Sequence, residues 1–407
     1  MKKIVQAWTG ISLVQRIVAG LVIGALLGMF VPSEGGIAIL GDVFVGALKA
    51  IAPLLVFFLV ISSLCYAGKS HGGVIRTVII MYMFSTFLAA IVAVAASSAF
   101  PVTLTLSEAA ADMAAPQGVA EVLRTLLMNV VTNPVQSLVS ANYIGILVWA
   151  VLIGIALRKA SDTTKQSLND ISAALSKTVT WIIQCAPFGI MGLVYNTVSV
   201  NGLSTFTEYG KLLAVLLGSM LFIYFVTNPI LVFWCIRKNP YPLIFKCLKK
   251  SAITAFFTRS SAANIPINME ACAEMGLDKD TYSVTIPLGA TINMDGAAIT
   301  ITVMTLAAAH TLGIAVDIPS AIILSILATL SACGASGVAG GSLLLIPMAC
   351  SLFGISNDIA MQIVGIGFII GVIQDSVETA LNSSSDLLLS ASAEFRQWRL
   401  EGKEIKF

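Results

Sequence analysis

The chain has 407 residues, of which 57% are hydrophobic and 11% are charged, and its mean hydropathy is +0.93. A soluble domain carries about a quarter charged residues, so this composition excludes an ordinary soluble protein and indicates a polytopic helical membrane protein. The formal net charge of +2 is too small to predict a nucleic-acid partner.

Apolar runs recur along the whole chain, and some are long enough to cross about 30 Å of hydrocarbon. They include residues 17–31, 43–65, 78–100, 144–157, 212–236 and 363–373. Further spans are expected around 186–189 and between 286 and 306. Lys and Arg collect in alternate connections, so the positive-inside bias places both termini in the cytoplasm and makes the number of crossings even. We expect eight.

Two other segments are expected to enter the membrane and leave on the same side. Residues 242–268 have apolar stretches on either side of the polar tip 258–266, and residues 321–352 surround the Ser- and Gly-rich tip 331–342. Non-helical backbone at membrane depth is tolerated where it lines a cavity, so both tips predict ligand sites. The predicted fold class is an all-α polytopic membrane protein with eight transmembrane helices and two re-entrant helical hairpins, which form a faint inverted repeat.

The last apolar run leads into a row of polar side chains. At about 100° per residue, five of them fall within an arc of roughly 100° on one helix face. They are Asp375, Glu378, Thr379, Asn382 and Asp386. Such a stripe cannot face lipid, because each charge there costs at least about 2.5 kcal/mol. We therefore expect the stripe to face a site.

Two further constellations contain groups that could bind ions. The run Asn293-Met294-Asp295-Gly296 interrupts an apolar span, and carbonyls freed by a broken helix together with one carboxylate suit a small cation such as Na⁺. The alternative is that Asn293 and Asp295 only bind neighbouring helices. The tip 258–266 offers hydroxyls, amide groups and Arg259 to a carboxylate, unless it is a polar cytoplasmic loop.

The glycines of 334–341 are expected to let the second tip close over a ligand, with close helix packing as the alternative. Enzyme signatures are absent from the sequence. It has no H-E-x-x-H or G-x-S-x-G motif, and neither of its two histidines adjoins a nucleophile candidate. We expect a protein that is not an enzyme and uses no organic cofactor.

Several motifs together resemble the dicarboxylate/amino acid:cation symporter family, which has the glutamate transporter fold. They are Ser260-Ser261, Asn293-Met-Asp-Gly296, the Gly337-Val338 tip, Asp375-x₃-Thr379-x₂-Asn382-x₃-Asp386, Leu48-Lys49 with Pro53-Leu54, Asn133-Pro134 with Asn142, and Ala186-Pro-Phe-Gly189. The resemblance implies a homotrimer in a bacterial inner (cytoplasmic) membrane, in which a transport domain moves as an elevator. Residues 1–240 would form mainly the scaffold, although the third and sixth spans join the transport domain. Residues 241–393 would form the transport core and 394–407 a cytoplasmic tail.

The resemblance also implies a role for each matching residue. The carboxylate of an amino acid would lie on Ser261, beside Ser260, and on Asn382. Its ammonium group would lie on Asp375 and on carbonyls of Arg259 and Val338, with Thr379 and Gly340 lining the pocket. Na⁺ would be held at three places: by Asp386 with carbonyls of Gly289, Asn293 and Asn382; by Asp295 with Asn293, Tyr82, Ser85 and Thr86; and by Thr291 and Met294 with second-tip carbonyls, for which Ala332, Cys333 and Ala335 are the candidates.

The chain departs from the family pattern where it matters for the substrate. Members that take acidic substrates carry Arg four residues before the position of Asn382, and this chain has Glu378 there. A like charge disfavours aspartate and glutamate, so we expect Na⁺-coupled import of small neutral amino acids, with serine and threonine first. Glu378 could accept a hydrogen bond from a hydroxyl or be neutralised by Arg259. Ala262, Ala297 and Ala339 replace a Ser, a Thr and a Pro that are common in the family.

Three alternatives compete with this prediction. The first keeps the fold but makes Glu378 a proton carrier in an H⁺-coupled symporter of dicarboxylates or acidic amino acids. The second is a channel, which would need a continuous polar lumen, whereas the polar groups gather in four segments near the end of the chain. The third is a membrane-embedded enzyme, for which a nucleophile and base pair are missing.

Overall fold

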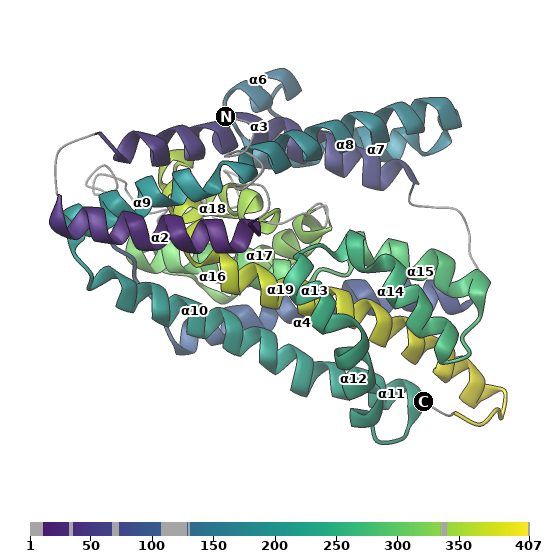
Figure 1. Cartoon of the computed structure of the whole chain (residues 1–407). Coiled ribbons are helices and arrows are strands. Elements are labelled where there is room, and N and C mark those ends of the chain that lie inside the picture. The colour runs from purple at the N-terminus through teal and green to yellow at the C-terminus, as the bar shows by residue number, and fades with distance from the viewer. Residues whose placement is uncertain are drawn as a thin grey trace.

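The computed structural model describes residues 11–31, 36–66, 73–106, 128, 131–333, 335 and 340–405. These residues form helices joined by short connections, and no strand occurs among them (Figure 1). The α-helices, in chain order, are α2 (Leu13–Phe30), α3 (Ala38–Tyr66), α4 (Gly73–Ala99), α6 (Pro134–Val139), α7 (Tyr143–Ala156), α8 (Asp162–Gln184), α9 (Ala186–Asn201), α10 (Thr205–Phe222), α11 (Asn228–Ile236), α12 (Tyr241–Cys247), α13 (Ile253–Thr258), α14 (Ser261–Glu274), α15 (Lys279–Ile292), α16 (Asp295–Thr311), α17 (Ile318–Ala332), α18 (Ile346–Ser351) and α19 (Asn357–Leu400).

Six helical segments in the described part of the chain are long and apolar enough to cross a membrane. They are Leu13–Phe30, Ala38–Ser62, Gly73–Ala99, Thr205–Ile236, Lys279–Thr311 and Asn357–Leu400. The pair α8 and α9, bent by 55° at its junction, makes a seventh if it counts as one span. The expected count of eight is not reached, because α7 has only 14 residues. A helix of that length extends about 21 Å, which is less than the hydrocarbon thickness of about 30 Å.

The first helices pack closely through glycine. Gly20, Gly24 and Gly28 form a stripe on α2 that lies directly against the backbone of α9. A Cβ atom at Gly24 would lie 2.4 Å from the carbonyl oxygen of Met191, so no larger residue fits there without moving a helix. Small residues at such spacing allow helix backbones to approach in a membrane, where no hydrophobic effect drives association. The helices α2, α3, α7, α8 and α9 thereby form one packed group.

The second group surrounds α16 and α19, whose side chains are largely buried. The helices α4, α10, α11 and α13–α18 pack against one or both of them. Figure 1 shows α3, α7 and α8 along one side of the molecule and α10, α11 and α12 along the other, with α19 between them. An ion pair between Lys49 of α3 and Asp358 of α19 joins the two groups.

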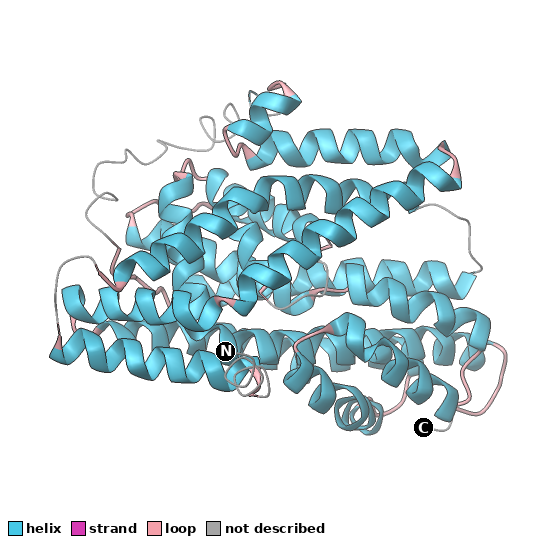
Figure 2. Ribbon diagram, turned by 45° about the horizontal axis from the view of Figure 1, so that its top comes forward, coloured by secondary structure: helices cyan, strands magenta, loops and turns pink. Residues whose placement is uncertain are grey.

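Each segment expected to form a hairpin contains helices on both sides of an interruption, and Figure 2 shows short loops that join helices. In the first, α13 ends at Thr258, the next residue, Arg259, has a left-handed φ of +52°, and α14 begins at Ser261. The tip is therefore shorter than the predicted 258–266, and Pro266 lies inside α14. The second hairpin comprises α17 and α18 with the 3-10 turn Ser342–Leu345, and most of its tip lies outside the described residues.

Helices α15 and α16 form one span that is broken at Asn293 and Met294, where the backbone leaves helical geometry. The helix α19 is continuous over 44 residues and ends at Leu400, so the expected tail boundary at 394 falls inside it. Its last turns are anchored, because Glu394 accepts a hydrogen bond from the Asp278 amide and the Arg399 guanidinium donates to the Cys235 carbonyl.

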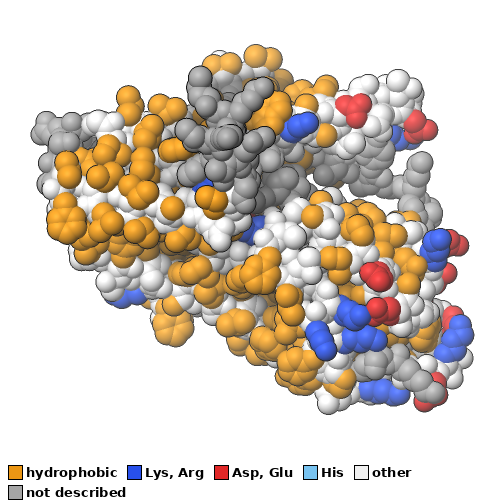
Figure 3. Space-filling model, viewed as in Figure 1, with side chains coloured by type: hydrophobic (Ala, Val, Ile, Leu, Met, Phe, Trp, Pro, Cys, Tyr) orange, Lys and Arg blue, Asp and Glu red, His pale blue; other side chains and the backbone are white. Residues whose placement is uncertain are grey.

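The surface agrees with a membrane protein. Figure 3 shows hydrophobic side chains over most of one face, whereas most of the charged side chains on that face gather at the end that contains the C-terminus. Exposed Ile, Leu, Val and Phe residues occur on α2, α3, α10, α11 and α17. Because monomeric soluble proteins rarely expose apolar patches of this extent, this face suits contact with lipid.

Candidate functional site

The polar stripe of α19 lies in the interior of the second group. Asp375, Glu378, Thr379, Asn382 and Asp386 are all between 1% and 6% exposed. They face three places where another helix is interrupted: the tip of the first hairpin, the described end of the second tip, and the break between α15 and α16. Interrupted helices supply backbone groups that helical hydrogen bonds do not use, which is a common way to build a ligand site in a membrane.

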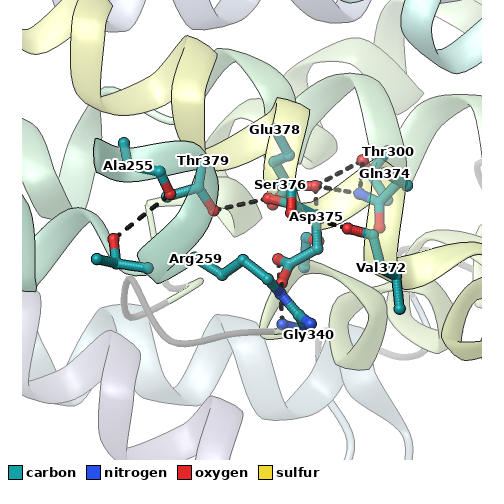
Figure 4. Close-up of polar contacts among 12 residues, drawn as sticks. Ala255, Arg259, Thr300, Gly340, Val372, Gln374, Asp375, Ser376, Glu378 and Thr379 are labelled. Atoms are coloured by element: carbon teal, nitrogen blue, oxygen red, sulfur yellow. Dashed lines mark hydrogen bonds and ion pairs between the residues drawn. The ribbon is translucent and has the colours of Figure 1, made fainter. Parts of the chain in front are cut away.

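At one end of the stripe, Asp375 binds Arg259. The guanidinium Nε of Arg259 lies 2.6 Å from Asp375 Oδ2, and the Gly340 amide donates to Asp375 Oδ1 at 3.2 Å (Figure 4). One carboxylate thus connects the first hairpin to the second. A cavity of about 10 Å³ adjoins this contact, which is room for about one water molecule. This space is too small for a molecule larger than water.

Glu378 lies one turn further along the stripe and has neutral partners. Its Oε2 atom accepts hydrogen bonds from Gln374 at 2.5 Å, Thr300 at 2.7 Å and Ser342 at 3.0 Å. Arg259 forms its ion pair with Asp375, and no ion pair between Arg259 and Glu378 occurs among the described residues. The sequence analysis did not identify the three donors. Of the three, only Gln374 could have been predicted from the sequence, because it precedes Glu378 by four residues and so shares its helix face.

Asn382 and Thr379 are held by nearby backbone and sulfur atoms. Asn382 Oδ1 accepts from the Gly296 amide at 2.7 Å, and its Nδ2 atom lies 3.4 Å from the Met294 sulfur. The Thr379 hydroxyl donates to the carbonyl of Asp375 at 2.8 Å. Asn382 therefore ties the stripe to the break between α15 and α16, where Gly296 allows the close approach: a Cβ atom there would lie 2.9 Å from Glu378.

The remaining expected substrate residues that the structure describes lie at the ends of the hairpin helices. Ser260 is the N-cap of α14, and its hydroxyl accepts a hydrogen bond from the Ala263 amide. Ser261, the first residue of α14, is buried. These positions put hydroxyls and amide groups of a helix N-terminus beside Arg259. Gly340 is described, whereas Val338 lies outside the described residues.

Around Asp386, acceptor oxygens gather without enough donors. Asp386 Oδ1 accepts from Asn293 Nδ2 at 2.9 Å, and the Tyr82 hydroxyl donates to the Asp386 carbonyl at 2.9 Å. Asp386 Oδ2 and Asn293 Oδ1 are buried and have no hydrogen-bond partner in the described part of the structure. Gly289 leaves the room for this contact, since a Cβ atom there would lie 2.8 Å from Asp386 Oδ1. Unpartnered buried oxygens beside a carboxylate suit a small hard cation.

A second oxygen cluster surrounds Asp295, which is fully buried. Ser85 of α4 donates to Asp295 Oδ2 at 2.8 Å, and the Thr86 hydroxyl has two acceptors within reach, Asp295 Oδ1 at 3.1 Å and the Tyr82 carbonyl at 3.0 Å. Tyr82 belongs to both clusters: its carbonyl accepts from Thr86, while its hydroxyl lies at Asp386. Ser85 and Thr86 therefore adjoin Asp295 as expected, and the Tyr82 hydroxyl reaches the backbone carbonyl of Asp386.

The third expected cation position is described only in part. The Thr291 hydroxyl donates to the Leu288 carbonyl and is not directed at the stripe. At the second tip, the Cys333 sulfur lies 3.6 Å from the Ile292 carbonyl, so this end of α17 adjoins the end of α15. The Ala335 amide donates to the Ala332 carbonyl, while residues 334 and 336–339 lie outside the described residues.

Comparison with known proteins agrees with these features. A sequence model of the sodium:dicarboxylate symporter family matches residues 13–394. A serine/threonine transporter, SstT, of Streptococcus thermophilus is 56% identical over 400 residues, which are 98% of this chain and 100% of that protein. The proteins of the same name from Bifidobacterium adolescentis and Streptococcus agalactiae are 55% identical over 406 residues and 56% identical over 395 residues. These alignments cover 100% and 97% of this chain, and 94% and 98% of the relatives.

Proposed function

Because this chain belongs to the sodium:dicarboxylate symporter family, we propose that it is a secondary transporter that imports L-serine and L-threonine together with Na⁺. The relatives named above carry serine/threonine transporter in their names. The observation within the site that carries the proposal is the environment of Glu378. A carboxylate and three neutral donors occupy the position at which an acidic substrate would need a cation.

The charges of the site favour a neutral substrate. Arg259 is the basic side chain among the described residues of the site. Its Nε atom already lies 2.6 Å from Asp375 Oδ2. The side-chain carboxylate of aspartate would therefore meet Glu378 with no opposing charge in contact, in a region where charges are poorly screened. The hydroxyl of serine or threonine, in contrast, can donate a hydrogen bond to Glu378. This difference is the proposed basis of selectivity.

We place the substrate ammonium group at Asp375, where it takes over the role of the Arg259 guanidinium. A buried carboxylate needs a positive partner, so the exchange keeps Asp375 paired throughout. The α-carboxylate is placed at Ser261 and Asn382, close to the first amides of α14, where the positive end of the helix favours an anion. To bind the α-carboxylate, the Asn382 amide group would break its contact with the Met294 sulfur.

Na⁺ is proposed to bind at Asp386 and at Asp295. Support comes from the two unpartnered oxygens, Asp386 Oδ2 and Asn293 Oδ1, and from the hydroxyls of Ser85 and Thr86 on Asp295. A cation at these places offsets two buried carboxylates that have no basic partner in the described structure. Thr291, Met294 and the second-tip carbonyls are retained as a third candidate position.

The proposed movement follows the two packed groups. The group of α2, α3, α7, α8 and α9 is proposed as the scaffold, and the group around α16 and α19, which includes α4, α10 and α11, as the moving transport domain. Full membrane topology would then require α7, with the turns that flank it, to complete an eighth crossing. The homotrimer, the cytoplasmic termini and the bacterial inner membrane belong to the same proposal and rest on family resemblance.

Ligand-dependent stabilisation of the purified protein tests the proposal. The apparent melting temperature is measured with L-serine, L-threonine or L-aspartate, each in NaCl and in choline chloride. We expect serine and threonine to raise it in NaCl alone, and aspartate to leave it unchanged. Stabilisation by aspartate that strengthens as the pH falls, without Na⁺, would favour the H⁺-coupled alternative with Glu378 as the proton carrier.

A further inference from the structure

Asn228 is a buried polar residue that neither the sequence analysis nor the proposed function uses. It is the first residue of α11 and is 0% exposed. Its Oδ1 atom lies 3.4 Å from the hydroxyl oxygen of Ser85, while its Nδ2 atom has no partner among the described residues. Burying an amide with an unmade hydrogen bond costs free energy, so its position beside a cation-site residue requires an explanation.

The backbone presents Asn228 to α4 through an unusual turn. The residues just before it, Ile223–Thr227, form a π-helical turn, and such turns occur frequently at functional sites. One extra residue in a turn rotates everything after it by about 100° relative to a continuous α-helix. Pro229 cannot donate an amide hydrogen, and the Tyr241 hydroxyl binds the Phe225 carbonyl instead.

The Ser85 hydroxyl has two acceptors within reach and only one proton. Asp295 Oδ2 lies at 2.8 Å and Asn228 Oδ1 at 3.4 Å, so the proton goes to the carboxylate in this structure. Thr86, the other hydroxyl on Asp295, has an analogous second acceptor in the Tyr82 carbonyl at 3.0 Å. Each hydroxyl at this carboxylate therefore has one acceptor at Asp295 and one away from it.

A cation at Asp295 changes what these hydroxyls must do. To bind Na⁺, an oxygen turns a lone pair to the ion, and its proton must point elsewhere. We propose that Asn228 is a positioning residue of the Asp295 cation site, whose Oδ1 atom receives the Ser85 proton while Na⁺ is bound. The inference rests on the proposed Na⁺ coupling and extends it to a helix, α11, that carries none of the expected ligands.

A double-mutant cycle tests this role. The melting temperature of the purified protein in detergent is measured as a function of Na⁺ concentration. The proteins compared are the wild type, Asn228→Leu, Ser85→Ala and the double variant. We expect Asn228→Leu to raise the Na⁺ concentration for half-maximal stabilisation about tenfold, which corresponds to ~1.4 kcal/mol. In the Ser85→Ala background, the same change should have no further effect, because the proton that Asn228 receives is gone.

Two further variants separate positioning from general stability. Asn228→Asp keeps an oxygen at the same place and should retain wild-type Na⁺ affinity or better. Ser97→Ala removes a buried, unpartnered hydroxyl from the same helix as Ser85 and should leave the Na⁺ titration unchanged. If Asn228→Leu does not fold, Asn228→Ala takes its place in the cycle.

Two results would overturn the inference. One is an unchanged Na⁺ titration in Asn228→Leu, and the other is an equal loss of affinity whether Ser85 or Ala stands at position 85. A wild-type protein that Na⁺ does not stabilise at all would instead refute the proposed coupling, on which the inference depends. The wild-type titration therefore distinguishes the two failures.

Discussion

The contact between Arg259 and Asp375 makes the sharpest prediction for substrate binding. We expect Asp375→Asn to abolish serine binding, because the substrate ammonium group would lose its anionic partner. The same change should destabilise the protein without substrate, since it leaves the Arg259 guanidinium buried beside a neutral amide.

The magnitude follows from burial. The two side chains are 9% and 4% exposed and lie 2.6 Å apart, so this is a buried pair. Removing one partner of such a pair costs about 3–5 kcal/mol, which changes an equilibrium by about 100-fold or more. The exposed pair Lys250 and Glu274 joins the π-helical turn Leu248–Ala252 to α14. Its side chains are 42% and 41% exposed, and such pairs contribute about 0–1 kcal/mol.

The assay compares Asp375→Asn with Glu274→Gln as a matched control, since each change removes one carboxylate charge from an ion pair of the first hairpin. Melting temperature without substrate reports stability, and titration with L-serine in NaCl reports binding. We expect a lower melting temperature and no serine response for Asp375→Asn. The control should resemble the wild type in both measurements.

Retention of serine binding within tenfold by a folded Asp375→Asn variant would refute the placement of the ammonium group. Equal melting temperatures for the two variants would refute the claim that the Arg259 contact is a buried, stabilising pair. The first result would move the substrate away from this end of the stripe.

Three further changes test other parts of the account. Asp386→Asn should raise the Na⁺ concentration for half-maximal serine uptake at least tenfold, measured from the Na⁺ dependence of initial rates, because it removes the charge from an unpartnered oxygen cluster. Gly24→Leu should prevent α2 from packing on α9 and reduce the yield of folded protein in size-exclusion chromatography, whereas Gly218→Ala, which has open space around its Cβ position, should not. Glu378→Gln should allow excess aspartate to inhibit serine uptake in a competition assay, because the repelling charge is removed.

The sequence predicted the parts of the site that depend on one helix or one short segment. The stripe of α19 was visible because polar residues at helical spacing cannot face lipid. The break at Asn293 and Met294 was visible because a polar run interrupted an apolar span, and the tip of the first hairpin was visible for the same reason.

Contacts between distant segments could not be predicted in this way. Thr300 and Ser342 meet Glu378 only through packing of α16 and the second hairpin on α19, and nothing in their local sequence indicates it. Asn228 was missed because a π-helical turn shifts its face, which periodicity does not reveal. Pro266 suggested a long tip, but it lies within α14. A proline inside a helix removes one backbone hydrogen bond, and here the helix continues past it.

The most direct test of the central claim is uptake of radiolabelled L-serine into proteoliposomes under an inward Na⁺ gradient, repeated with K⁺ or a pH gradient alone, and each time with excess aspartate. The account predicts uptake that requires Na⁺ and is unaffected by aspartate. Uptake that proceeds on the pH gradient without Na⁺, or that aspartate blocks, would contradict it.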